Sequence, residues 1–153
     1  MRKTLTICSV LAVALAGCGS SSNKDAQAAQ DYAVRVQSAQ FQFANAFQDA
    51  TNSLLKSSDP KHDASALRAA ATAVDRDVTQ LKRITPPAKV ARLHQKLITA
   101  MKGYSVQLNR AAHLIAGGDP KAFVRAKQIL RTSSQQIKNS FTSIIRQINA
   151  KLA

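Results

Sequence analysis

Three histidines are the groups of this 153-residue chain that titrate nearest to neutral pH, and they lie far apart in the sequence. His62 follows a proline in a stretch typical of a loop. His94 and His113 fall on one predicted helix, which would hold them about 28 Å apart. They therefore cannot share a metal ion within one chain, and we expect neither a metal site nor a cofactor. Because His94 neighbours apolar helix positions, we interpret it as a hydrogen-bonded histidine at the edge of the core.

The sequence supports nucleophilic catalysis no better than it supports a metal site. Serine and threonine are plentiful, but we identify no nucleophile with a dedicated general base among them. The glycine-rich phosphate loops, the zinc-protease motif and the serine-hydrolase motif are missing from the sequence, so we expect no enzymatic activity. One polar stretch, Thr132–Gln136, interrupts an apolar helix face. It is either a hydrogen-bonded layer that fixes helix register or a small polar pocket near Tyr104.

The beginning of the chain carries a targeting signal. Arg2 and Lys3 precede an apolar run over residues 4–16, which is too short to span a membrane and has the length typical of a signal peptide. The run ends in Leu15-Ala16-Gly17-Cys18, which resembles the lipobox of bacterial lipoproteins. The resemblance implies removal of residues 1–17 and a thioether-linked diacylglycerol on Cys18.

This resemblance predicts the organisation and location of the mature protein. Residues 18–24 would be the lipidated cysteine and a flexible tether, and residues 25–153 a helical domain. The protein would be exported and anchored to the outer face of the bacterial cell membrane, or to an outer membrane if the host has one. Ordinary secretion, with cleavage after Ala16 and a free thiol on Cys18, is the alternative that the residues leave open.

Apolar residues recur at steps of three and four through the rest of the chain, and Pro, Gly and Asp interrupt the pattern. We therefore predict an all-α fold, an antiparallel up-down four-helix bundle with a shorter second helix. Thr85-Pro86-Pro87, followed by Leu93-His94 and Leu97, resembles small helical actinobacterial lipoproteins of unknown function, which implies a helical hairpin at this turn. The predicted helices span about 25–56, 64–84, 87–116 and 120–151.

Charge is unevenly distributed along the chain. The net charge is +14, every acid is Asp, and residues 86–153 hold twelve basic residues but only one acid, Asp119. An exported basic surface that lacks interleaved aromatic residues suits anionic lipids or wall polymers better than nucleic acid. We predict a membrane-anchored, non-enzymatic binding module. Its polyanion-contact residues would be Lys121, Arg125, Lys127, Arg131 and Lys138.

Two alternatives to a polyanion-binding surface remain at this point. The positive charge could serve only to keep a small exported domain in solution. The bundle could instead carry a small apolar ligand in its interior or in an open groove, because its apolar stripes are rich in alanine and one predicted helix is short.

Overall fold

The computed structural model describes the backbone of residues 22–56 and 59–153, and the side chains of residues 25–48 and 59–153. The predicted signal peptide, Cys18 and the first part of the tether lie outside these residues. The described part is helical and holds no strand, which confirms the prediction of an all-α chain with four helices. The helices are α1 (Ser22–Lys56), α2 (Pro60–Lys82), α3 (Ala91–Ala116) and α4 (Pro120–Leu152), with the short 3-10 helix η1 (Ala88–Val90) before α3.

Two Asp-Pro pairs begin helices α2 and α4. The carboxylates of Asp59 and Asp119 each accept a hydrogen bond from the backbone N–H two residues later, at 2.9 Å, and proline follows in the first turn. The carboxylate satisfies a helix N–H that has no partner within the helix, and proline has the backbone angle that a first turn needs. Before α4, Gly118 adopts a φ of +69°, a conformation that favours glycine and ends α3.

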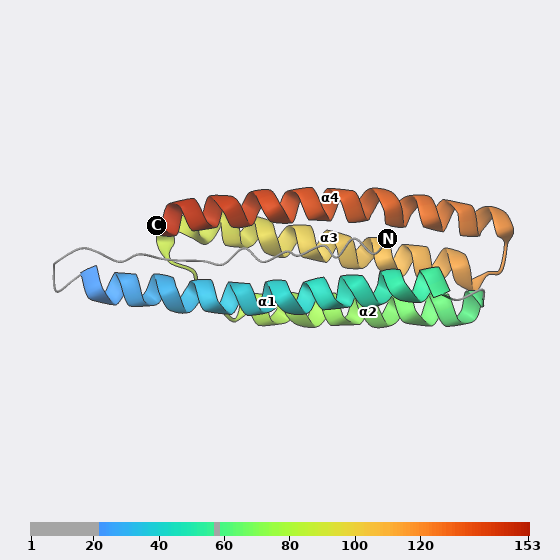
Figure 1. Cartoon of the computed structure of the whole chain (residues 1–153), viewed down its shortest axis with the longest axis horizontal. Helices are drawn as coiled ribbons and strands as arrows, with labels where there is room; N and C mark the ends of the chain where they lie inside the picture. The colour runs from blue at the N-terminus through green and yellow to red at the C-terminus, as the bar shows by residue number, and fades with distance from the viewer. Residues whose placement is uncertain (1–21, 57–58) are drawn as a thin grey trace, which may run out of the picture.

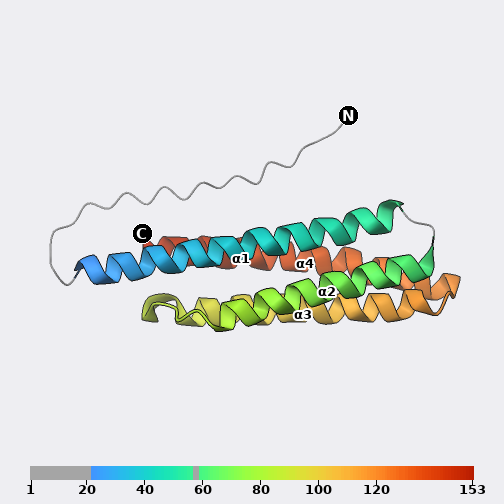
Figure 2. The ribbon, with the colours of Figure 1, turned by 90° about the horizontal axis from the view of Figure 1, so that it is seen from below.

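Consecutive helices pack side by side along their lengths. The close contacts join α1 to α2, α2 to α3, and α3 to α4. Figure 1 shows α3 with α4 in one layer and α1 with α2 in the other, whereas Figure 2 groups α1 with α4 and α2 with α3. In both views the four helices run alongside one another. The helices contain 35, 23, 26 and 33 residues in chain order.

Apolar residues of all four helices meet in one core. Phe43 of α1 stacks on Phe141 of α4, with ring centroids 5.3 Å apart, and it meets Tyr104 of α3 edge-on at 5.8 Å. These three rings join α1 to the α3–α4 pair at mid-bundle. Fully or almost fully buried aliphatic residues extend the core in both directions, among them Leu67, Val74, Leu81, Val90, Leu97, Met101, Leu108, Ile115 and Ile148.

Several details of the helices differ from the prediction. Helix α1 begins at Ser22, so the last three residues of the predicted tether continue the helix. Pro87 is followed by one 3-10 turn before α3 becomes regular. Phe123, in the first turn of α4, is only half-buried. Phe41 of α1 is 68% exposed.

Candidate functional site

His94 links three helices at one end of the core. It lies in the first turn of α3, and its Nε2–H donates a hydrogen bond of 3.0 Å to the carbonyl oxygen of Leu81, in the last turn of α2. A carbonyl only accepts, so this bond fixes the proton on Nε2 and leaves Nδ1 as an acceptor. The hydroxyl of Tyr32 on α1 donates to Nδ1 at 3.1 Å. Both ring nitrogens are thus satisfied.

Burial holds this cluster in its neutral form. His94 is 5% exposed, and burial lowers the pKa of its imidazole, an effect that the backbone hydrogen bond to Leu81 partly offsets. Burial also raises the pKa of Tyr32 to about 12. A histidine without solvent access and with both nitrogens engaged is poorly placed for acid–base catalysis. The prediction of a hydrogen-bonded core-edge histidine is confirmed, and His62 and His113 are exposed.

The polar stretch of α4 forms contacts inside the helix bundle. The hydroxyl oxygens of Ser134 and Tyr104 lie 3.4 Å apart, which confirms the proximity expected from an antiparallel pair of helices. Ser133 is buried and donates to the carbonyl oxygen of Leu130 in its own helix. These bonds favour the interpretation of a hydrogen-bonded layer over that of a pocket.

Two buried carboxylates are the feature that the sequence interpretation missed. Asp63 and Asp77 of α2 are 1% and 4% exposed, and one oxygen of each has no hydrogen-bond partner within the described part of the chain. Burial raises the pKa of Asp77 to about 6. The two residues are separated by two seven-residue steps, with the buried Ala70 between them, which places them in one column beside the apolar stripe. The seven-residue spacing was the feature of the sequence that could have identified these two acids as buried.

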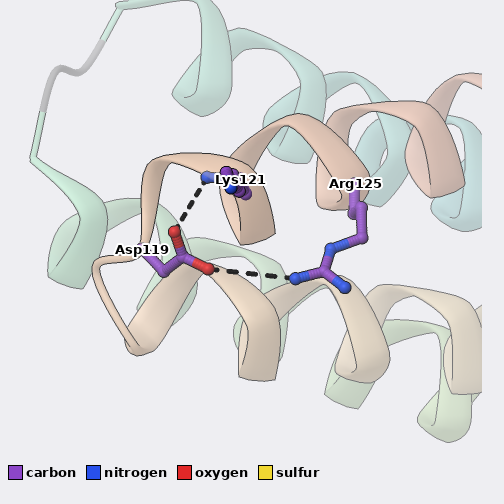
Figure 3. A network of polar contacts seen from close by, with 3 residues as sticks. All are labelled: Asp119, Lys121 and Arg125. Carbon is purple, nitrogen blue, oxygen red and sulfur yellow. Dashed lines mark hydrogen bonds and ion pairs between the residues drawn. The ribbon is translucent and has the colours of Figure 1, made fainter.

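The predicted polyanion-contact residues of α4 are all exposed. Near the start of the helix, Nη2 of Arg125 lies 3.8 Å from Oδ2 of Asp119, whose other oxygen accepts from the backbone N–H of Lys121 (Figure 3). The ammonium group of Lys127 lies 4.5 Å from the centroid of the Phe123 ring. Exposed contacts of this kind contribute little to stability and leave the cations accessible.

Helix geometry divides these predicted residues between two sides of α4. A helix turns about 100° per residue, which puts Lys127, Arg131 and Lys138 within about 40° of one another. Lys121 and Arg125 point at least about 80° away from every member of that group. The structure therefore does not gather the five residues into one patch.

A shallow groove runs along the outer seam between α3 and α4. Its volume is about 410 Å³, and most of its lining surface is apolar, although two cationic side chains and one amide side chain take part in it. Helix α3 contributes most of the lining, and α4 contributes a hydroxyl and an apolar side chain. The lining residues are Arg92, Gln95, Lys96, Thr99, Ala100, Ser140 and Ile144.

Within the described residues, no helix has the length and apolar character needed to cross a membrane. The same part of the chain holds no group of three or more His, Cys, Asp or Glu residues arranged to bind a metal ion. Comparison of the chain with protein-family models, with curated proteins and with solved structures finds no match.

Proposed function

We propose that this protein is a bacterial lipoprotein, anchored through Cys18, that acts as a non-enzymatic binding module at the cell envelope. Its helices would form an antiparallel up-down bundle with a short second helix. The basic α3–α4 hairpin would contact anionic lipids or wall polymers. The export signal and the lipobox support the anchor, whereas the charge of the hairpin supports the contact.

The observation that carries the contact is the exposure of the hairpin's cations. All twelve basic residues between 86 and 153 are exposed, and the single acid of that stretch is Asp119, at one end of the bundle. A surface with so little compensating negative charge attracts polyanions at physiological ionic strength. Anionic headgroups and wall polymers are the polyanions that an exported, anchored domain would meet.

The anchor is tested by growing cells with a labelled fatty acid and isolating the protein. The wild-type chain should carry the label and fractionate with membranes, because two or three acyl chains make binding almost permanent. Cys18→Ser removes the sulfur that forms the thioether, so the variant should lose the label. An unlabelled wild-type chain in the soluble fraction would overturn the anchor.

The contact is tested by the salt dependence of adhesion to anionic surfaces. Residues 22–153, without the signal and Cys18, should bind vesicles that contain phosphatidylglycerol and should ignore phosphatidylcholine vesicles. Raising salt from 0.1 M to 1 M should release the protein, since the Debye length falls from about 10 Å to about 3 Å. If the domain does not bind these vesicles at low salt, the positive charge serves only to keep the domain in solution.

A further inference from the structure

Part of the hairpin's positive charge lies on the face that holds the groove. Arg92, Lys96 and Arg110 of α3 point within about 40° of one direction. Because Arg92 and Lys96 line the groove between α3 and α4, that direction is the outer side of the seam. On α4, Ser140 lines the same groove and lies within about 60° of the direction of Arg125, but about 160° from Lys138. Lys151 lies within about 20° of Ser140, whereas Lys121 lies about 100° away. We call Arg92, Lys96, Arg110, Arg125 and Lys151 the seam face.

The seam face combines positive charge with an apolar groove. Between Asp77 and Asp119 the chain holds no acid, so no carboxylate of α3 offsets Arg92 or Lys96. Those two lining residues are one helical turn apart, and Ser140 brings a hydroxyl to the same groove, whereas the hydroxyl of Thr99 already donates to the carbonyl oxygen of Gln95 at 3.0 Å. Ala100 and Ile144 supply the apolar part of the lining. Guanidinium and ammonium groups beside a hydroxyl donor suit a phosphate ester.

We propose that this groove binds the headgroup of an anionic phospholipid. The phosphate would lie on Arg92 and Lys96, and the apolar portion next to the glycerol would lie against Ala100 and Ile144. An apolar lining favours a lipid over inorganic phosphate or a sugar–phosphate polymer, neither of which has an apolar portion to bury. The inference rests on the proposed function and specifies it. Lipid contact would occur through the seam face, while Lys127, Arg131 and Lys138 on the other side of α4 would contribute little.

The test places a fluorescent label beside the groove in the full chain as cells produce it. Gly103 lies one turn beyond Thr99 on α3, and a Cβ atom added there meets nothing within 4 Å, so Gly103→Cys provides an attachment point. The labelled protein is reconstituted in phosphatidylcholine vesicles that contain brominated phosphatidylglycerol or, separately, brominated phosphatidylcholine. Bromine quenches the label only at close range. Brominated phosphatidylglycerol should quench the label strongly, and brominated phosphatidylcholine should have little effect.

Matched variants distinguish the groove from bulk charge. Arg92→Gln and Arg131→Gln each remove one exposed guanidinium, and each arginine has a lysine four residues away on its own helix. Arg92→Gln should raise the phosphatidylglycerol fraction needed for half-maximal quenching about fivefold, the equivalent of about 1 kcal/mol per cation. Arg131→Gln should change it less than about twofold. Thr99→Asp adds a carboxylate at the rim of the groove and should abolish the difference between the two brominated lipids.

Three results would overturn the groove as a lipid site. They are equal quenching by the two brominated lipids, equal shifts from Arg92→Gln and Arg131→Gln, and full relief of quenching by millimolar glycerol phosphate, which would assign the site to free phosphate esters. The mass of the purified chain separates this inference from the proposed function. A chain without acyl groups would contradict the anchor, and adding that chain to preformed vesicles would still test the groove.

Discussion

Asp77→Asn should stabilise the protein at neutral pH. The carboxyl of Asp77 is 4% exposed, and one of its oxygens has no hydrogen-bond partner in the described part of the chain. Burial raises its pKa from 3.8 to about 6. The folded state therefore binds a proton that the unfolded state has released over this range, and wild-type stability falls as pH rises through it.

The size of this cost follows from the shift. A difference of roughly two pKa units, at 1.36 kcal/mol for each, gives an upper value of about 3 kcal/mol, fully expressed above pH 6 and absent below pH 4. The neutral amide of asparagine has nearly the same shape and carries no charge to desolvate. We expect Asp77→Asn to be about 1–3 kcal/mol more stable than the wild type at pH 7, and within about 0.5 kcal/mol of it at pH 4.

Urea unfolding of residues 22–153, followed by far-UV circular dichroism between pH 4 and pH 8, measures this difference. Asp75→Asn is the matched control, because Asp75 lies two residues away on the exposed side of α2 and should behave as the wild type at every pH. His94 changes stability in the opposite direction. Its lowered pKa makes the protein less stable as pH falls below 6.5, and this slope should persist in both variants. A destabilised Asp77→Asn at pH 7 would refute the argument that its charge is buried without compensation.

Four further substitutions test the packing and the helix cap. Phe141→Asp should abolish the cooperative loss of helix on heating, because it removes the ring stacked on Phe43 and buries a charge, which costs several kcal/mol. A thermal transition like that of the parent would show that α4 does not bury this position. Tyr32→Phe should lower the free energy of unfolding in urea by about 1–2 kcal/mol, because it leaves a buried imidazole nitrogen of His94 without its hydrogen-bond donor. Tyr104→Phe should lower it less, because the hydroxyl of Tyr104 makes a longer contact of 3.4 Å. The reverse order would contradict the buried histidine cluster. Asp119→Ala should cost about 1 kcal/mol through loss of the α4 cap, and an unchanged midpoint would show that the cap contributes nothing.

The helices were predictable because their signals are local. Asp119, Pro120 and the glycine before them act on the backbone next to them, so the end of α3 and the start of α4 follow from a few residues. The spacing of three and four residues likewise identifies Phe141 as buried, because one face of a helix covers the core wherever that helix packs.

The candidate site depends on how helices rotate against each other, which one helix alone does not specify. Arg92 and Lys96 stood out less in the sequence than the α4 cations, and only the packing of α3 on α4 brings them beside Ser140 and Ile144. The same holds for Asp77. Its position at the edge of the apolar stripe is compatible with solvent or with burial, and the width of the packed face decides between them.

The measurement that tests the central claim most directly is the mass of the N-terminal peptide of the protein isolated from membranes. The account predicts a peptide that begins at Cys18 and carries the mass of a diacylglycerol, with or without a third acyl chain. A peptide that begins at Gly17 with a free thiol on Cys18, or an uncleaved N-terminus without lipid, would contradict the proposed anchor.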